Sequence, residues 1–457
     1  MAEYGPDACL HEILSLQGDG RWGIDTAHAI PGVTAYAVRS FDNDALLLSL
    51  PLIVHRPLLS EIPLDARGAA GAVALSIERI KQKAASVPGL GPLAGQGTRF
   101  PHQYASTTEP YTLVASPAAL ASDLWHADNR NFADMAGLHL LLRGAVPCPQ
   151  VFSAHDISRV TETAACLCDA VAECVFSLPV RVLEDAWITT LDQQVLREQL
   201  PSLGLVSFIS DGARLARQCT RYRCFFRTAG PKEGVSIPFA CPQELAPLEL
   251  DLAASNRTVT GLGIKKQEVF AVAGSNAQGK TTFLDGIIAG MDDHAAGDGR
   301  ELVVTVHGLC TAEATNCLLT GSDVSMFFSA LPPGMEGTAQ AAYGMGSGSM
   351  NMARQVQEAV VRGAPLLIID EDRAAPNLLV RSCLQTGEVT PLSEILSCDR
   401  KKMGETALVF AACAMDTLVA QADRIMVLDR HVASAIDRRV FRKKVAESLE
   451  NMARDLG

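Results

Sequence analysis

The sequence predicts an α/β fold with a mainly parallel sheet in the second half of the chain, preceded by an α+β region. Three observations lead to this fold class. The chain has 457 residues, too many for a single ordinary core. After about residue 246, apolar strand-like runs alternate with helical segments, as they do where helices cover a parallel sheet. Earlier residues lack this alternation, so we predict an α+β N-terminal domain over 1–245, an α/β domain over 246–430 and a C-terminal helix over 431–457.

The first half contains short apolar runs and amphipathic segments. The runs ALLLSLPLIV and GLVSFIS are typical of strands, and AGAVALSIERIKQKAASV and ETAACLCDAVAECVFSL are typical of helices. Between them, VPGLGPLAGQGTRFPHQ is rich in glycine and proline and predicts a surface loop.

The second half supplies the alternating elements. Strands are expected at EVFAVAG, ELVVTV, PLLIID, TALVFAA and RIMVLD. Helices are expected from Lys280 onward, around Met352 to Arg362, and at the C-terminal segment DRRVFRKKVAESLENMARDLG.

Composition narrows the class of protein. With 48% apolar and 20% charged residues, no apolar run of 18 or more and no recognisable targeting segment, we expect a soluble globular protein without a membrane span. The 13 cysteines form no CxxC pair, which favours buried thiols in a reducing compartment over a zinc site or a disulfide framework. A net charge of −12 argues against a surface that coats nucleic acid throughout, but not against a local basic groove.

A phosphate-binding loop is the strongest motif. Gly274, Gly279, Lys280 and Thr281 match GxxxxGK[ST] between a predicted strand and a predicted helix. Glycines let backbone N–H groups point at phosphate oxygens, and the helix N-terminus adds positive potential. Lys280 is expected to reach the β- and γ-phosphates, and the Thr281 hydroxyl to bind Mg²⁺. The residues predicted to hold the nucleotide here are Gly274, Ser275, Asn276, Ala277, Gln278, Gly279, Lys280, Thr281 and Thr282.

An acidic pair ends the strand PLLIID. Asp370 is a candidate for the Mg²⁺ shell, together with Thr281, and Glu371 is a candidate for polarising the attacking water. An apolar run that ends in aspartate is weak evidence alone. It gains weight from the segment that precedes it.

That segment, MGSGSMNMARQ, has the composition of a flexible linker. However, Ser347 lies 23 residues before Asp370. ATPases of the ATP-binding-cassette (ABC) class place a serine-glycine signature turn at this distance, since one turn, about three turns of helix, a loop and a strand fill the interval. Ser347 and Gly348 resemble the Ser-Gly of that signature, and a chance loop is the alternative.

Three features depart from the ABC pattern. Asn377 stands where an aspartate is usual, and Cys413 stands where the switch histidine is usual. There is also no aromatic residue between Ala240 and Val269, the region in which many cassettes stack the adenine. We therefore expect slow turnover, with Glu371, Lys280 and Asp370 as the catalytic candidates.

The chain resembles a small family of predicted ATPases of the ABC class, which are soluble and lack a transporter partner. The resemblance covers roughly residues 190–385, including NRTVTGLGIKKQEVFAVAGSNAQGKTTFL and GSGSMNMARQVQEAVVRGAPLLIIDEDRAAPNLLVR, and GDGRWGIDTAHAIPG is a looser match. It implies an ABC-type P-loop domain that binds ATP or ADP with Mg²⁺. It also implies a homodimer in which Ser347 and Gly348 of one subunit touch the nucleotide held by Lys280 of the other.

One member of this family is associated with mitochondrial uridine insertion/deletion RNA editing. That resemblance implies RNA binding, subunits of an editing complex as partners, and a mitochondrial location. An independent trace is the basic segment DGARLARQCTRYRCFFRTAGPK, in which aromatic residues are interleaved. A solvated basic hairpin is the alternative. The candidate RNA-binding residues are Arg214, Arg217, Arg221, Arg223 and Arg227.

Two other functions stay open on the sequence alone. The first is a scaffold whose nucleotide site only stabilises a dimer, which the missing histidine favours. The second is the ATPase subunit of a transporter, which would need a separate membrane partner.

Overall fold

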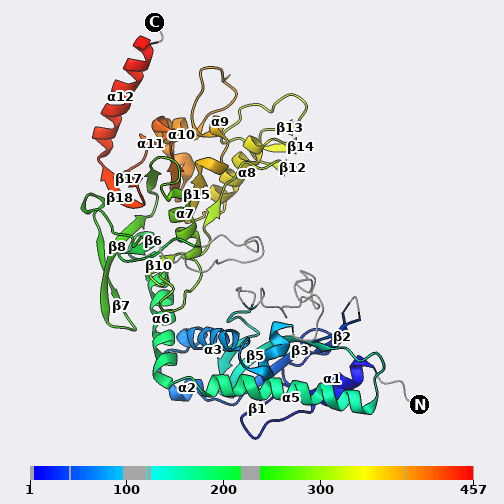
Figure 1. Cartoon of the computed structure of the whole chain (residues 1–457). Coiled ribbons are helices and arrows are strands. Elements are labelled where there is room, and N and C mark those ends of the chain that lie inside the picture. Colours follow the sequence, from blue (N-terminus) through cyan, green and yellow to red (C-terminus); the bar gives the residue numbers. More distant parts are fainter. Residues whose placement is uncertain are drawn as a thin grey trace. The chain divides into compact units, whose positions relative to one another are not determined.

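The computed structural model describes residues 5–40, 43–95, 120, 125–217, 237–385 and 387–455. It forms two compact units (Figure 1). Unit 1 takes in the chain up to Gln194, and unit 2 takes in most of the chain from Val195 onward. The division falls within helix α6 (Val180–Gln199), well before the boundary near residue 245 that the sequence suggests.

Unit 1 is built on an antiparallel sheet with the strand order β1-β3-β5-β4, and β2 also pairs with β3. Its strands are β1 (Trp22–Ile24), β2 (Tyr36–Arg39), β3 (Ala45–Val54), β4 (Phe132–Asp134) and β5 (Gly137–Pro147). Its helices are α1 (Pro6–Leu14), α2 (Leu58–Glu61), η1 (Ala66–Gly68), α3 (Ala69–Lys83), η2 (Pro88–Ala94) and α5 (Ala154–Phe176), together with the first part of α6.

One face of this sheet carries the core of unit 1. Side chains alternate between the two faces of a strand, so Leu52 of β3 and Leu140 of β5 share the face that packs on α3 and α5. The segment around η2, predicted as a surface loop, instead inserts Leu90 and Leu93 into this core, where both are almost fully buried. Burial of its two leucines holds this segment against the core, although its glycines and prolines are typical of a loop.

Unit 2 contains a six-stranded sheet with the order β11-β15-β16-β9-β17-β18. All neighbouring pairs are parallel except β17–β18, which is antiparallel. The strands are β9 (Val269–Ala273), β11 (Cys310–Thr311), β15 (Leu366–Asp370), β16 (Ala407–Ala412), β17 (Arg424–Asp429) and β18 (Val432–Ile436).

The register of the central strands brings their carboxyl ends to one edge. Ala412 of β16 lies opposite Ala273 of β9, and Ala411 lies opposite Asp370 of β15. Side chains alternate between the two faces of β9, and both faces are buried. Val269 and Ala271 pack in one apolar cluster, and Phe270 and Val272 pack in another. The second cluster contains Phe283 of helix α7 (Lys280–Ala289).

A second, antiparallel sheet has the order β10-β6-β8-β7. Its strands are β6 (Leu205–Ser210), β7 (Leu248–Leu252), β8 (Arg257–Lys265) and β10 (Val303–Thr305). Two expectations from the sequence differ from this arrangement. GLVSFIS (β6) was expected in the N-terminal domain but belongs to unit 2, and ELVVTV (β10) pairs with β6 instead of joining the parallel sheet. Both differences arise because antiparallel pairing joins strands that are far apart in sequence.

The remaining elements of unit 2 are a three-stranded sheet and several helices. A three-stranded sheet has the order β12-β14-β13, with β12 (Cys317–Ser322), β13 (Glu336–Thr338) and β14 (Ala341–Gly346). The helices are α8 (Gly348–Val361), α9 (Pro376–Leu379), α10 (Leu392–Cys398), α11 (Asp416–Val419), α12 (Arg438–Asp455), η4 (Gln243–Leu245), η5 (Glu371–Arg373) and η6 (Arg400–Met403).

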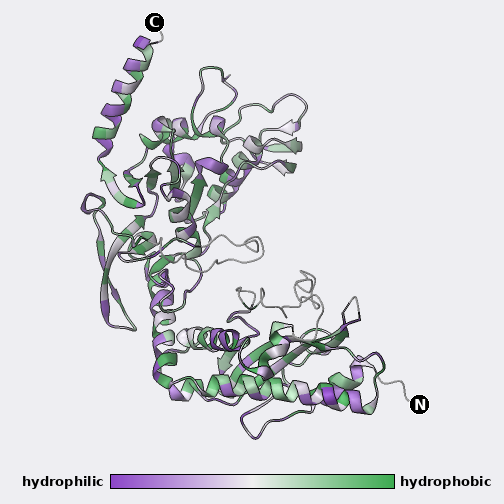
Figure 2. Cartoon of the chain, in the orientation of Figure 1, coloured by the Kyte–Doolittle hydropathy of each residue, from purple (hydrophilic) through white to green (hydrophobic). Residues whose placement is uncertain are grey.

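The C-terminal helix was expected over residues 431–457, but residues 432–436 form β18 before α12 begins. Figure 2 shows many hydrophilic residues along α12, and none of its residues is buried. None of the helices that the structure describes combines the length and apolar composition needed to cross a membrane.

A buried ion pair joins the two large sheets of unit 2. Arg424, at the start of β17, donates from Nε and Nη2 to the carboxylate of Glu268, at 2.5 and 2.8 Å. Its other N–H groups reach the carbonyls of Leu245 and Gly263, both at 2.6 Å. The Glu268 side chain is 5% exposed, so its charge depends on Arg424 for compensation.

We expect Arg424→Ala to lower the free energy of unfolding of unit 2 by about 3–5 kcal/mol, because it leaves a buried carboxylate unpaired. Circular dichroism in a urea titration would measure this. All three tryptophans, Trp22, Trp125 and Trp187, lie in unit 1. The urea midpoint followed by tryptophan fluorescence should therefore shift less than the midpoint followed by circular dichroism.

The matched control is Arg362→Ala, because the Arg362 side chain is 74% exposed. That variant should change the stability by no more than about 0.5 kcal/mol. Equal destabilisation by the two variants would contradict a structural role for the buried pair.

Candidate nucleotide site

The loop between β9 and α7 has the backbone shape that the glycine motif predicts. Gly274 has φ 144° and Gly279 has φ 99°. A Cβ on Gly274 would stand 2.4 Å from the carbonyl oxygen of Leu428, so no larger residue fits there. The loop therefore curls tightly at the N-terminus of α7, where backbone N–H groups favour an anion.

Lys280 lies at the start of α7 and is buried. Its Nζ donates to the carbonyl oxygens of Gly274 and Ser275, at 2.8 and 2.9 Å. The ammonium is thus held against the loop on whose N–H groups phosphate oxygens would lie. The predicted nucleotide-holding residues, Gly274 to Thr282, form this loop and the first turn of α7.

Thr281 and Asp370 meet across the edge of the sheet. Thr281 Oγ1 donates to Asp370 Oδ2 at 2.7 Å, although 89 residues separate them. A hydroxyl and a carboxylate are the hard oxygen ligands that Mg²⁺ prefers beside phosphates, so this pair fits that ion. Asp370 is 9% exposed, and its Oδ1 also accepts from the backbone N–H of Asp372 at 3.4 Å.

Glu371 follows Asp370 and is held by the loop after β16. Its carboxylate accepts from the backbone N–H groups of Cys413 and Ala414. Cys413 is the residue aligned with the missing switch histidine, and here its main chain contacts Glu371. The candidate base therefore lies next to Asp370, with its carboxylate already bound by the backbone.

The candidate signature turn caps helix α8. The Ser347 side chain accepts from the Met350 N–H, at the long distance of 3.5 Å, and Ser347 is exposed. The next serine, Ser349, donates from Oγ to Asn377 Oδ1 at 2.8 Å, which links the turn to the segment after the acids. Within the described part of this one chain, no hydrogen bond joins Ser347 or Gly348 to the phosphate loop.

The sequence did not indicate a role for the turn between β17 and β18. Arg430 and His431 have φ of 48° and 66°, the left-handed values of a tight hairpin turn. The Arg430 N–H donates to Gln278 Oε1. A Cβ on Gly279 would stand only 3.1 Å from His431 Nδ1, so the exposed imidazole lies against the phosphate loop.

The strand order separates this turn from the acidic pair. Asp370 ends β15 and Glu371 follows it, on one side of β9, and His431 follows β17, on the other side. If the γ-phosphate lies toward the acids, the nucleoside extends toward β17. The only hint in the sequence is a histidine in the short connection between two strands, which is too common to identify a site.

The structure describes two of the five candidate RNA-binding arginines. Arg217 is an ion-pair partner of Asp298, and its side chain is only 8% exposed. Burial acts to raise the pKa of Asp298, but the hydrogen bond from His294 and the charge of Arg217 outweigh it and lower that pKa. Arg214 is exposed. Arg221, Arg223 and Arg227 lie outside the described residues.

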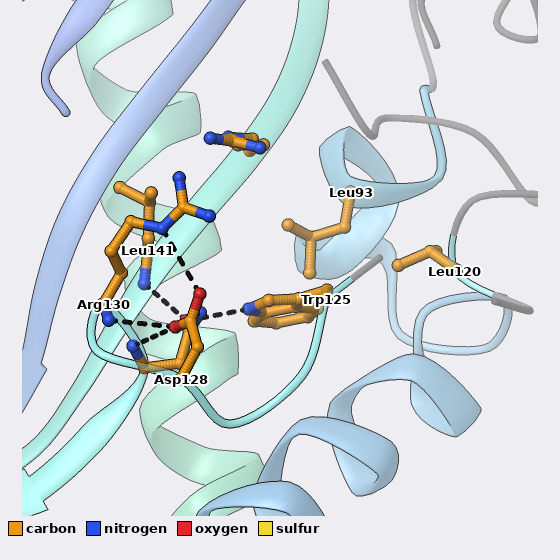
Figure 3. Close-up of a pocket in the computed structure, with 8 residues that line it drawn as sticks. Leu93, Leu120, Trp125, Asp128, Arg130 and Leu141 are labelled. Carbon is orange, nitrogen blue, oxygen red and sulfur yellow. Dashed lines mark hydrogen bonds and ion pairs between the residues drawn. The ribbon is translucent and has the colours of Figure 1, made fainter. Parts of the chain in front are cut away.

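Unit 1 contains a small pocket near β4 and β5 (Figure 3). Figure 3 shows Asp128 and Arg130 on one side of Trp125, with Leu93 and Leu120 on the other. Asp128 Oδ1 accepts from the backbone N–H groups of Arg130 and Asn131, at 2.9 and 2.8 Å. This carboxylate is thus engaged by its own loop, and the pocket belongs to a different unit from the phosphate loop.

A glycine loop with a buried lysine, and a hydroxyl–carboxylate pair at the carboxyl edge of a sheet, define a P-loop nucleotide-binding domain. Residues 179–456 match the family model described as ABC_ATPase, P-loop domain. The match covers more than half of the chain, and the chain belongs to this family. The expected P-loop domain and mixed α/β content are thereby confirmed.

The chain is also similar to the following protein and solved structures. An uncharacterized protein of Methanocaldococcus jannaschii is 37% identical over 412 residues, which is 90% of this chain and 89% of that protein. Among solved structures, a metal-chelate-type ABC transporter in an inward-facing conformation is 15% identical, covers 42% of this chain and 81% of its own, and has a TM-score of 0.27. A bacterial Atm1-family ABC exporter with ATP bound is 13% identical over 67% of this chain and 53% of its own, with a TM-score of 0.31.

We expect His431→Ala to weaken ADP binding about tenfold, because stacking of a base on an aromatic ring contributes about 1–3 kcal/mol. Calorimetric titration would measure the affinity, and His431→Phe should restore it. Affinity for inorganic tripolyphosphate, which has no base, should not change.

His307, an exposed histidine of the same unit, provides the matched control. His307→Ala should bind ADP as the unaltered chain does. An equal loss of tripolyphosphate affinity in His431→Ala would show that His431 supports the loop instead of the base.

Proposed function

We propose that the protein binds ATP with Mg²⁺ and hydrolyses it slowly as a homodimer. The observation that carries this proposal is the contact between Thr281 and Asp370, beside the Lys280 cradle. In this role Lys280 binds the β- and γ-phosphates, Thr281 and Asp370 hold Mg²⁺, and Glu371 orients the attacking water. Mg²⁺ held by these two residues would supply positive charge to the phosphate oxygens.

Slow turnover follows from the surroundings of Glu371. Its carboxylate accepts hydrogen bonds from the backbone N–H groups of Cys413 and Ala414, so its oxygens are already engaged and are less available to orient an attacking water. Cys413 offers no imidazole to contact the γ-phosphate. The same features favour the alternative in which nucleotide only stabilises a dimer, so hydrolysis and dimer formation must be measured separately.

The dimer is supported by an apolar surface that directly precedes the signature turn. Leu318 of β12 and Met345 of β14 are cross-strand partners, and their exposed fractions are 65% and 69%. Tyr343, two residues before Met345, is 48% exposed. Exposed large apolar groups beside Ser347 suit a face that closes on a second copy, with the Ser347 hydroxyl directed at the partner's nucleotide.

Glu371→Gln should trap the ATP-bound dimer, because the nucleotide is held but not cleaved. Size-exclusion chromatography with light scattering would show a dimer with ATP and a monomer without it. Lys280→Ala should lose both ATP binding and dimerisation. Introducing Ser347→Arg into the Glu371→Gln chain should preserve ATP binding by the monomer and prevent the dimer.

Ser397 lies exposed on α10 of the same unit, so Ser397→Arg is the matched control and should dimerise normally. An ATP-dependent dimer that Ser347→Arg leaves intact would rule out the signature role. A dimer that forms without measurable phosphate release, in the chain with Glu371 intact, would favour the scaffold alternative.

The proposed function includes RNA binding, coupled to ATP and serving mitochondrial RNA editing with other complex subunits. Its support is the family resemblance and the basic segment, of which Arg214 is exposed. We assign Arg217 a structural role rather than an RNA contact, because its guanidinium is paired with Asp298. A test of RNA contacts should therefore leave Arg217 unchanged.

We expect single-stranded RNA to raise the ATPase rate, and the triple change of Arg221, Arg223 and Arg227 to Glu to remove the stimulation. The basal rate should persist because the phosphate loop is untouched. A triple change of Lys443, Arg439 and Lys444 to Glu on α12 controls for net charge. Unaltered RNA affinity in the first variant would reject this part of the proposal.

A further inference from the structure

Unit 1 carries a cluster of imidazole and carboxylate groups that the nucleotide site does not use. Asp25 follows β1, His28 lies in the next turn, and His139 is on β5. His139 is on the opposite face of the sheet from Leu138 and Leu140, which pack in the core. The side chains of Asp25 and His139 are nevertheless only 7% and 6% exposed.

The three side chains converge on one point. Asp25 Oδ2 lies 2.7 Å from His28 Nδ1 and 2.6 Å from His139 Nδ1. One nitrogen or oxygen from each residue lies within 4.8 Å of the others. Two imidazole nitrogens and a carboxylate oxygen at this spacing are the ligand set of a three-residue site for a divalent transition metal.

A fourth side chain, that of Asp134, orients the His139 ring for metal binding. Asp134 Oδ1 lies 3.0 Å from His139 Nε2 and accepts from the backbone N–H groups of Ala136 and Gly137, at 2.8 and 3.2 Å. Asp134 is thus fixed as an acceptor and holds the proton on Nε2. Metal-binding histidines usually donate their second N–H to a carboxylate in this way, which leaves the Nδ1 lone pair for the ion.

Charge also favours a divalent cation. Two carboxylates, Asp25 and Asp134, flank His139, and a 2+ ion with neutral imidazoles would balance them. Phe132 stacks on the His139 ring with centroids 4.4 Å apart, which fixes the ring plane.

We propose that Asp25, His28 and His139 form a binding site for a divalent transition metal of the Zn²⁺ class, with Asp134 as the positioning residue of His139. The His28 side chain is 54% exposed, so one side of the site is open to water or an anionic group. The ion would tie the turn after β1 to the β4–β5 hairpin. This site is independent of the proposed ATPase activity.

The competing explanation is a metal-free ion-pair network. Ionised carboxylates only accept hydrogen bonds, so bonds from both His139 nitrogens would require the doubly protonated imidazolium. The two explanations differ in a measurable way, because only the first predicts uptake of metal.

The experiment titrates the purified full-length chain, free of nucleotide, with Co²⁺ and Zn²⁺. We expect one Co²⁺ per chain, with visible d–d absorption that Zn²⁺ displaces and no thiolate charge-transfer band. Zn²⁺ should raise the melting temperature of the tryptophan signal, since it binds only folded unit 1. His28→Ala and Asp25→Asn should lose both effects, and Asp134→Asn should weaken binding about 10- to 100-fold.

His155, exposed on α5, supplies the matched control, and His155→Ala should bind the metal normally. His28 is the most exposed ligand, so its variant should keep the fold, which circular dichroism would verify. Absence of Co²⁺ uptake, a thiolate band, or equal binding by His28→Ala would overturn the proposal. Lys280→Ala should bind the metal normally even though it loses ATP, so failure of one proposal is distinguishable from failure of the other.

Discussion

The register of the parallel sheet in unit 2 is the constraint on which the nucleotide site depends. Because Ala273, Ala412 and the Ala411–Asp370 pair are aligned, three strands end at one edge. Only then does Thr281, one residue into α7, reach Asp370. A slip of β15 by one residue would turn Asp370 toward the opposite face and separate the hydroxyl from the carboxylate.

Packing fixes this register from both faces. Phe270 and Val272 are buried on one side of β9 and Val269 and Ala271 on the other, so a shifted strand would lose apolar contacts on both. The pair of Arg424 and Glu268 adds a polar constraint at the opposite end of the strands, where apolar contacts give less directional control. Thus interactions at the amino ends of the strands help to fix the positions of the residues at their carboxyl ends.

The phosphate loop was predictable because one short stretch encodes it, whereas features assembled from distant stretches were not. The phosphate loop is local, and the 23-residue interval to Asp370 reflects consecutive elements. The pairing of β6 with β10 joins residues nearly a hundred positions apart, and no local pattern specifies it. The partner of Arg217 and the approach of His139 to Asp25, 114 residues apart, depend on tertiary contacts in the same way.

The bond between Ser349 and Asn377 has a consequence for how two sites behave together. In the proposed dimer, Ser349 is beside the turn that would touch the partner's nucleotide, whereas Asn377 follows the acidic residues that would act on the chain's own nucleotide. A single hydrogen bond would thus connect the dimer-facing turn of each subunit to the acidic residues of its own nucleotide site. In the proposed dimer, the two sites would sense each other's occupancy, and the rate should rise more steeply than linearly at low ATP concentration.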